Sequence, residues 1–362
     1  MKLFFIAAAN SIHSYRWIKY FAKAGHEVIW ISLAPSIFEP LPGVRYFEVE
    51  EASGLFGLLR AAAKIRKIIA HAQPDILHVH SVGTYGIVGL LTGFDPIVAT
   101  PWGSDVIYGK ESTIKRPFIA RILRRAALVT CDALHMRDEV MHFGVPAERI
   151  HIINFGIDSE RFTPRPPSPA IRSANDLGDA PAVISLRNFE PVYDIPTLLK
   201  AVPKVLDHHP NTRFMLVGRG TLEVELKALA SQLGIDHAVR FVGFVPNDQL
   251  PDTLCSMEVY VSTSLSDAGI AASTAEAMAC GLPVVVSDSG ENACWINDGE
   301  NGYLVPVSQP DALANRLNRL LGDAELRRRF GQAGRTTIKA RNNYHTEMEK
   351  MEALYQKTLV SK

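Results

Sequence analysis

Two series of alternating apolar and amphipathic segments run along the chain, and this pattern constrains the fold more than any other feature of the sequence. In the first series, apolar runs of strand length lie at 3–9, 28–33, 76–79 and 97–100, and the segment 14–24 has helical periodicity. Short apolar runs that alternate with helices are typical of a parallel sheet with helices on both faces. The sequence therefore predicts an α/β fold.

The alternation stops near Phe162 and resumes only after a proline-rich stretch, residues 163–181 (TPRPPSPAIRSANDLGDAP). Proline, serine and aspartate at this density predict a linker that holds no regular element. The second series is predicted to contain strands at 183–186, 213–217, 239–242, 259–262 and 284–287 and helices at 196–206 and 222–233. We expect two doubly wound, Rossmann-like domains, 1–162 and 182–339, which face a central cleft. The helical stripe within 340–362 must pack on one of them.

Composition and charge limit the class of protein. With 362 residues, 47% of them apolar, the chain is long enough for two hydrophobic cores. Its 38 basic and 38 acidic residues balance, so no overall field attracts nucleic acid or an anionic membrane. The four cysteines form no CxxC pair, which is typical of reduced thiols in the cytoplasm. No apolar run is long enough to span a membrane, and the opening MKLFFIAAA is interpreted as a strand rather than a signal peptide.

The segment 262–286 (STSLSDAGIAASTAEAMACGLPVVV) carries the strongest chemical signal. Small residues at 268–274 let the backbone approach a ligand closely, and the helix that follows directs its free N–H groups at an anion, which predicts a diphosphate site. Glu276, one turn into this helix, is placed to accept hydrogen bonds from ribose hydroxyls. Gly281 is expected to end the helix. The alternative is an ordinary helix with an exposed glutamate.

Seven segments along the chain, taken together, carry a resemblance to a known family. They read SIHSYRWIKYFAKAGHEV, DILHVHSVGTYG, TPWGSDVI, INFGIDSERFTP, FMLVGRG, EAMACGLPVVVSDSGEN and DGENGYLVPVSQPDALANRL. In this order they resemble the family-four retaining glycosyltransferases over nearly the whole chain. The resemblance implies the GT-B fold. It also implies transfer of a hexose-type sugar from a UDP- or GDP-sugar to a hydroxyl of a glycan or lipid-linked acceptor, with retention at the anomeric carbon.

One departure from the family concerns the diphosphate site. The family usually binds the diphosphate through an arginine and a lysine in a G-R-x4-K-G segment. Here that segment reads SLRNFEPVYDIP, so Arg187 matches the arginine while Tyr193 stands at or near the lysine position. The sequence has no Asp-x-Asp motif, so we expect no metal or other cofactor. Arg187 and the helix N-terminus would then neutralise the leaving nucleotide.

Two further charged residues are candidates near the donor. Arg219, in a Gly-Arg-Gly turn, would supply a second cation or contact the base, or would simply be solvated. The family carries two acidic residues eight positions apart, but counting back from Glu276 reaches Ala268, and the nearest carboxylate is Asp267. For Asp267, a sugar contact through a bulged loop and a helix cap both remain open. The residues expected to bind the donor are Ser11, Gly218, Arg219, Ala268, Gly269, Ile270, Ala271 and Glu276, and the predicted catalytic residues are His80, Arg187 and Asp267.

Histidines mark the first domain. His78 and His80 end a predicted strand, and their spacing directs both rings to one side of the sheet. If these two histidines bound a metal ion, they would need a third ligand, and the sequence shows no evident candidate. The resemblance implies instead that His80 lies against the transferred sugar, where it would hold a hydroxyl or the developing positive charge; the alternative is a buried, hydrogen-bonded histidine. The acceptor-side residues are predicted to be His13, Trp102 and Asp105, with a turn-forming role as the alternative for Asp105.

The segment 110–125 is basic, with six cations against Glu111. Apolar residues are interleaved with these cations, namely Ile114, Phe118, Ile119 and Ile122. This pattern favours peripheral contact with the cytoplasmic face of the inner membrane or with a lipid diphosphate, or else a solvated helix packed by its apolar side. We therefore expect a cytoplasmic enzyme of polysaccharide or cell-envelope biosynthesis without a nucleic-acid partner.

Other functions remain open from the sequence alone. A nucleotide-sugar epimerase or hydrolase on the same fold would need no acceptor groove. A non-catalytic nucleotide-sugar-binding or scaffold protein is favoured by Tyr193 and Ala268, which replace residues that the family uses. An NAD-dependent oxidoreductase is disfavoured, because neither domain begins with a GxGxxG turn.

Overall fold

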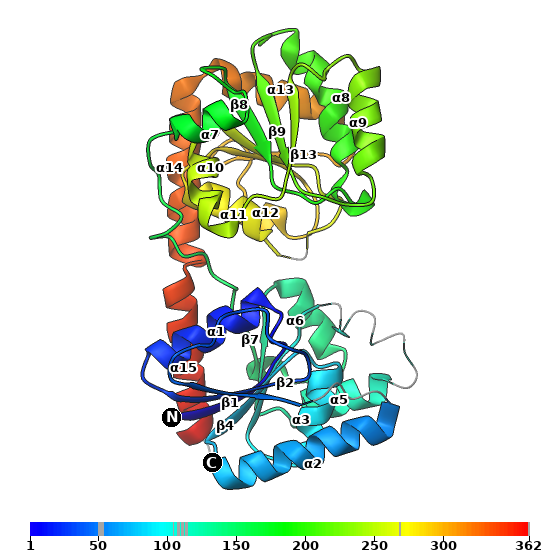
Figure 1. The fold of residues 1–362 in the computed structure, drawn as a ribbon, viewed down its shortest axis with the longest axis vertical. Coiled ribbons are helices and arrows are strands. Elements are labelled where there is room, and N and C mark those ends of the chain that lie inside the picture. The colour runs from blue at the N-terminus through cyan, green and yellow to red at the C-terminus, as the bar shows by residue number, and fades with distance from the viewer. Residues whose placement is uncertain are drawn as a thin grey trace. The chain divides into compact units, whose positions relative to one another are not determined.

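The computed structural model describes residues 1–49, 54–103, 105–106, 109, 112, 115–267 and 269–360. The chain divides into two compact units, shown in Figure 1. The first unit consists of Met1–Phe155 together with His345–Lys362, and the second of Gly156–Tyr344. The chain therefore passes between the units twice.

The described part of the first unit is built on a sheet of seven parallel strands in the order β3-β2-β1-β4-β5-β6-β7. The strands are β1 (Lys2–Ile6), β2 (Glu27–Ser32), β3 (Val44–Glu48), β4 (Ile76–His80), β5 (Ile97–Thr100), β6 (Leu128–Cys131) and β7 (Ile150–Ile152). The helices are α1 (Ile12–Lys23), α2 (Gly54–Ala72), α3 (Thr84–Thr92), α5 (Lys115–Arg125), α6 (Leu134–Met141) and α15 (Tyr344–Val360). The strand order reverses its direction beside β1, which makes the sheet doubly wound.

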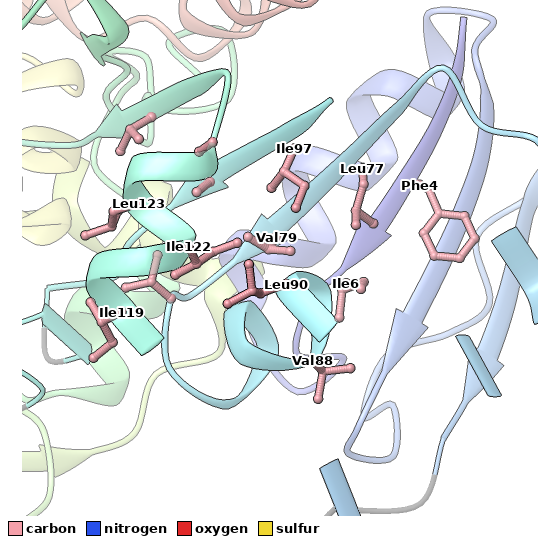
Figure 2. Packing of buried hydrophobic residues seen from close by; sticks show 14 of the residues in the cluster. Phe4, Ile6, Leu77, Val79, Val88, Leu90, Ile97, Ile119, Ile122 and Leu123 are labelled. Atoms are coloured by element: carbon pink, nitrogen blue, oxygen red, sulfur yellow. The ribbon is translucent and has the colours of Figure 1, made fainter. Parts of the chain in front are cut away.

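Branched apolar side chains fill the space between this sheet and the helices on it, as Figure 2 shows. Ile6 of β1 and Val79 of β4 are fully buried there, together with Val88 of α3. A Cβ on Gly89 would lie only 2.5 Å from Val79 Cγ1, so glycine at this position lets α3 pack closely on β4.

The second unit repeats the plan with six parallel strands in the order β10-β9-β8-β11-β12-β13 among its described residues. They are β8 (Ala182–Ser185), β9 (Arg213–Val217), β10 (Val239–Gly243), β11 (Val259–Ser262), β12 (Val284–Ser287) and β13 (Tyr303–Val305). The helices are α7 (Pro169–Ala174), α8 (Ile195–Leu206), α9 (Glu223–Gln232), α10 (Leu250–Cys255), α11 (Ala272–Ala279), α12 (Asn292–Trp295), α13 (Pro310–Gly322) and α14 (Ala324–Arg341). Separate apolar clusters lie on the two faces of the sheet.

The second unit begins earlier and ends later than the sequence predicts, because the residues at its two ends pair with each other. Ile157 N donates to Asn342 O at 2.7 Å, and Tyr344 N donates to Ile157 O at 3.0 Å. These bonds place 156–162 and 340–344 in the second unit rather than in an N-terminal domain.

Residues 163–181 are not an irregular linker, and the prediction that they hold no regular element is wrong. They belong to the second unit and contain α7. Ser168 starts this helix by accepting a hydrogen bond from Ile171 N, and Pro169 occupies the first turn, where an intrahelical N–H donor is not required. Leu177, just beyond α7, is buried in the core of the unit.

The last helix, α15, completes the first unit, which answers the question that its apolar stripe left open. Met348, Met351 and Tyr355 are fully buried, and the ring of Tyr355 lies 5.2 Å from that of Phe21 in α1. At its start, Glu347 accepts a hydrogen bond from Asn154 N at 2.8 Å. The C-terminal segment is therefore part of the N-terminal core. No helix within the described residues is long and apolar enough to cross a membrane.

Candidate functional site

A cavity of about 560 Å³ lies beyond the carboxyl ends of β8, β9 and β10 in the second unit. Parallel sheets commonly bind ligands at this edge. Among the predicted site residues, those that line the cavity are Arg187, Gly218, Arg219, Asp267, Ala271 and Glu276. Gly269 and Ile270 are not among the lining residues, and Ala268 lies outside the described residues.

Arg187 follows β8, and its side chain is only 10% exposed, so it is a largely buried cation. Its guanidinium forms an ion pair with Asp267 and donates to Ser264 Oγ at 3.1 Å. The guanidinium carbon also lies 4.3 Å from the ring centre of Tyr193. Tyr193, at or near the position of the family's lysine, is therefore an aromatic partner of Arg187.

Asp267 is held from several sides. Besides Arg187, its carboxylate accepts hydrogen bonds from Ser264 Oγ at 3.2 Å and from Asn292 Nδ2 at 3.5 Å. A Cβ on Gly290 would lie 1.6 Å from Asp267 O, so only glycine allows the loop after β12 to pass this close. Asp267 does not cap α11, whose N-cap is Ala271 without a side-chain hydrogen bond, so that alternative is wrong.

The loop after β9 brings the second arginine to the cavity. A Cβ on Gly218 would lie 2.4 Å from Arg187 O, and one on Gly220 would lie 2.3 Å from Phe189 O, so the two glycines let this loop pack on the loop after β8. Between them, Arg219 is exposed and has no hydrogen bond or ion pair from its side chain within the described part of the chain. It is thus a free cation at the cavity.

The start of α11 forms another wall of the cavity, through Ala271, Ala272 and Ser273. Because the N-cap of α11 provides no side-chain acceptor, the first backbone N–H groups of the helix remain available to a ligand. Glu276 also lines the cavity, one turn further along α11. Of the predicted residues in this segment, Ala271 and Glu276 line the cavity.

The sequence analysis missed Phe244, which lines the cavity although its side chain is 72% exposed. Phe244 directly follows β10, and a large aromatic residue directly after a predicted strand is the signal that indicates it. An exposed ring at the rim of a cavity offers a stacking surface for a flat ligand.

In the first unit, β4 carries two buried histidines, and their rings lie on one side of the sheet with centroids 4.5 Å apart, as predicted. His78 pairs with Tyr355 Oη at 2.5 Å and with Thr100 Oγ1 at 2.7 Å, so it is fully hydrogen-bonded. Burial, reinforced by the charge of His80, holds the pKa of His78 well below its usual value. His78 is therefore a neutral, structural residue.

His80 differs from His78 because only one ring nitrogen is satisfied. Nδ1 pairs with Ser14 Oγ at 3.3 Å, while Nε2 is buried and has no partner among the described residues. Burial, and secondarily the charge of His13, lowers the pKa of His80 to about 3, so the ring is neutral at pH 7. A neutral imidazole with a free nitrogen can exchange a hydrogen bond with a ligand hydroxyl.

The other predicted residues of the first unit have defined places. His13 stacks on Phe155 at 4.3 Å between ring centroids and lies 5.5 Å from Trp102, and burial, with the charge of Arg16, lowers its pKa to about 4. Ser11 caps α1.

The carboxylate of Asp105 is committed to its loop. It accepts hydrogen bonds from the backbone N–H groups of Val82 at 2.6 Å, Trp102 at 2.9 Å and Val106 at 3.0 Å. This is the turn-forming role that the sequence left open. No cluster of three or more histidine, cysteine or acidic residues that could hold a metal occurs in the described residues.

Two family models match the chain: a glycosyl transferase 4-like domain over residues 2–133 and glycosyl transferases group 1 over residues 168–337. A phosphatidyl-myo-inositol mannosyltransferase of Mycobacterium tuberculosis is 30% identical over 289 residues, which cover 76% of this chain and 72% of the relative. The chain is a family-four glycosyltransferase.

A second relative of this glycosyltransferase is the GDP-mannose-dependent alpha-(1-6)-phosphatidylinositol monomannoside mannosyltransferase of Mycolicibacterium smegmatis. It is 27% identical over 284 residues, covering 76% of this chain and 74% of the relative. In fold, the glycosyltransferase resembles Anabaena Alr3699/HepE in complex with UDP, with a TM-score of 0.82, 19% identity and coverage of 99% of this chain and 100% of that one. The prediction of two Rossmann-like domains of the GT-B type is confirmed.

Proposed function

We propose that this glycosyltransferase moves a hexose from a UDP- or GDP-sugar to a hydroxyl of a glycan or lipid-linked acceptor, with retention of configuration and without a metal ion. The observation that carries the proposal is the cavity of the second unit, where Arg187, Arg219 and the start of α11 surround one space. Two cations and a row of free backbone N–H groups match the charge of a diphosphate.

The leaving nucleotide is neutralised by the protein in this proposal. Arg187 binds the phosphate oxygens, held in position by the ring of Tyr193, and Arg219 supplies the charge that the usual lysine would provide. Fixed cations and oriented N–H groups stabilise the negative charge that develops on the leaving diphosphate. Asp267 orients Arg187 and lies where it can accept a hydrogen bond from a sugar hydroxyl.

The nucleoside is held by the remaining walls of the cavity. Glu276 accepts hydrogen bonds from the ribose hydroxyls, and Phe244 stacks on the base. In the first unit, Nε2 of His80, which has no hydrogen-bond partner among the described residues, binds a substrate hydroxyl. The acceptor oxygen forms a bond to the anomeric carbon on the face where the bond to the diphosphate breaks, and the hydroxyl proton passes to the departing diphosphate oxygen. No covalent intermediate with the protein is formed.

The relatives support the donor and acceptor classes. Their names include GDP-mannose and phosphatidylinositol among the substrates, and the structural neighbour was solved with UDP. We propose that the enzyme acts in glycan assembly on the cytoplasmic side of the membrane, where nucleotide-sugars are available. The basic segment 110–125 would add charge for a lipid diphosphate there, although Lys110, Glu111 and Ile114 lie outside the described residues.

A thermal-shift and titration panel of UDP- and GDP-sugars, with and without EDTA, tests the donor site. Stabilisation by one nucleotide class, unchanged by EDTA and lost in Arg187→Ala, supports it. The matched control is Arg165→Ala, because Arg165 forms a partly exposed ion pair with Asp252 in the same unit. If no nucleotide changes the melting curve of the folded protein, the donor assignment fails.

Product analysis separates the remaining possibilities. Incubation with the stabilising nucleotide-sugar and a panel of glycan and lipid-linked acceptors, followed by NMR of the anomeric centre, distinguishes retention from inversion. Free sugar without a glycoside would indicate a hydrolase, and a changed but still nucleotide-bound sugar would indicate an epimerase. Binding without any turnover would support the scaffold interpretation.

A further inference from the structure

Two cysteines of the second unit meet at the ends of two helices. Cys255 is the last residue of α10 and is partly exposed, whereas Cys280 directly follows α11 and is 5% exposed. Their thiols are hydrogen-bonding partners, and both cysteines are free. Neither side chain lines the donor cavity, so the contact is separate from the site described above.

Backbone contacts to the segment 163–164 hold the two cysteines at the same place. Cys255 Sγ donates to Thr163 O at 3.4 Å. A Cβ on Gly281 would lie 3.1 Å from Pro164 Cγ, so the end of α11 lies against the same segment. The meeting of the two thiols is therefore built into the packing of α10 and α11 on one stretch of chain.

The two thiols differ in reactivity. The hydrogen bond from Cys280 lowers the pKa of the Cys255 thiol, although partial burial opposes this shift. The same bond, together with burial, raises the pKa of Cys280. A partly exposed cysteine with thiolate character beside a second thiol is the arrangement in which one sulfur reacts with an oxidant and the other resolves the product.

We propose that Cys255 and Cys280 form a reversible disulfide in the presence of a hydroperoxide, and that this bond weakens binding of the donor. The Cys255 thiolate attacks one peroxide oxygen, which breaks the O–O bond and leaves a sulfenic acid; the departing oxygen takes up the proton that Cys255 lost. Cys280 then attacks the sulfenic sulfur, and its proton leaves with the hydroxyl group as water. The two thiols together lose two electrons to the hydroperoxide, and a dithiol reductant reverses the reaction.

The disulfide joins two helices that line the donor cavity. Leu250 of α10 lines it, as do residues 271–273 and Glu276 of α11. Cys280 N donates to Glu276 O at 3.0 Å, so the two residues are one helical turn apart. A covalent bond between the sulfurs is shorter than the hydrogen bond that it replaces, so it draws the ends of α10 and α11 together and moves Glu276 relative to the ribose. This consequence rests on the proposed function of the cavity.

Peroxide titration of the full chain, followed by intact mass and peptide mapping, tests the disulfide. Every protein in the series carries Cys294→Ser, which removes an exposed thiol that peroxide would oxidise independently. The expected product has lost the mass of two hydrogen atoms and yields a peptide in which Cys255 is linked to Cys280. The internal control is Cys131, which is fully buried and whose pKa burial raises to about 12, so it should remain a thiol.

Two single variants separate the roles of the sulfurs. In Cys280→Ala, peroxide should leave a sulfenic acid at Cys255 that dimedone captures. In Cys255→Ala, Cys280 should remain a thiol under the same treatment. Melting curves of the reduced variants report whether each of them is folded.

Calorimetric titration with UDP and with GDP, before and after peroxide, tests the effect on the donor site. Oxidation should weaken binding of the preferred nucleotide about tenfold, which is the effect of losing one hydrogen bond to a carboxylate, and dithiothreitol should restore it. The matched control is Cys255→Ala, whose affinity should be the same before and after peroxide.

Four results are decisive against parts of this reasoning. Oxidised, folded protein without the linked peptide refutes the disulfide. Capture of a sulfenic acid at Cys280 rather than Cys255 refutes the assigned roles. A disulfide that leaves nucleotide affinity unchanged refutes the coupling to the cavity. If the reduced protein binds neither nucleotide, the proposed donor site fails instead, while the mass measurement still decides whether the disulfide forms.

Discussion

Replacing Asp267 with asparagine should reveal two opposite effects of the buried ion pair. The pair stabilises the folded protein, but Asp267 also competes with the donor diphosphate for Arg187. Asp267 and Arg187 are almost fully buried, with side-chain exposures of 6% and 10%. Asparagine keeps the size of the side chain, and its amide oxygen in the Oδ1 position keeps the hydrogen bond from Ser264. Its NH2 group cannot accept the weak hydrogen bond from Asn292, and the negative charge is removed. Arg187 would then be a buried cation without a counter-charge.

The magnitude follows from burial. Removing one partner of a buried ion pair costs about 3–5 kcal/mol, and the ring of Tyr193 together with the retained amide oxygen favours the lower end, about 3 kcal/mol. For a unit of this size, that corresponds to a melting temperature lower by about 6–12 °C. The effect on binding is the opposite. In the variant, Arg187 does not have to break a charge-assisted hydrogen bond to residue 267 before it binds a phosphate, so a nucleoside diphosphate should bind about tenfold more tightly.

The assay combines differential scanning fluorimetry with calorimetric titration of the nucleoside diphosphate. A ligand at 100 times its dissociation constant adds about 2.7 kcal/mol, so it should restore nearly all of the lost stability in Asp267→Asn. The control is Asp252→Asn, because the pair of Asp252 with Arg165 is 47% and 35% exposed and should contribute about 1 kcal/mol or less. Equal melting temperatures for the two variants, or weaker nucleotide binding by Asp267→Asn, would refute this reasoning.

Three further changes test other parts of the molecule. Tyr193→Lys should add a third phosphate-binding cation to Arg187 and Arg219 and tighten nucleotide binding roughly tenfold by calorimetry; unchanged affinity would show that this position does not face the phosphates. Burial lowers the folded-state pKa of His80 to about 3, so its stabilising effect is complete above about pH 6.5 and is lost as the pH falls towards 3. The free energy of unfolding should therefore decrease by up to about 1.4 kcal/mol per pH unit for this residue, and urea titrations at pH 7 and pH 5 should show a shallower dependence in His80→Gln. Tyr355→Phe removes the hydroxyl that pairs with His78 and should lower the urea-derived stability by about 1–3 kcal/mol, whereas no change would mean that the pair contributes nothing net.

Most strands could be predicted from the sequence because they are buried on both faces and read as continuous apolar runs. The predicted ranges 97–100, 213–217, 259–262 and 284–287 coincide with β5, β9, β11 and β12. The edge strand β3 has no such run, because its side chains are mostly exposed. β3 forms because it pairs with the neighbouring strand β2, not because it is apolar. A local sequence pattern does not show such a pairing.

The chemistry of the site was predictable where it depends on local geometry. The start of α11 and the glycines around Arg219 follow from short motifs. The partner of Arg187 was not predictable, since Asp267 lies 80 positions away and meets it only after β8 and β11 pair. Likewise, α7 forms in a proline-rich stretch because Ser168 and Pro169 happen to suit a helix start, which overall composition does not reveal.

The membership of α15 in the first unit affects how the chain folds during synthesis. Tyr355 is synthesised only after the whole second unit, yet it pairs with His78 of the central strand β4. The N-terminal sheet must therefore wait, with a strip of its core uncovered, until the whole second unit has been translated. The second unit, by contrast, has all of its strands and helices in one continuous stretch and can finish first. Translation order and folding order are thus reversed, and loss of α15 would leave its damage in the N-terminal sheet rather than in the second unit that precedes α15 in the sequence.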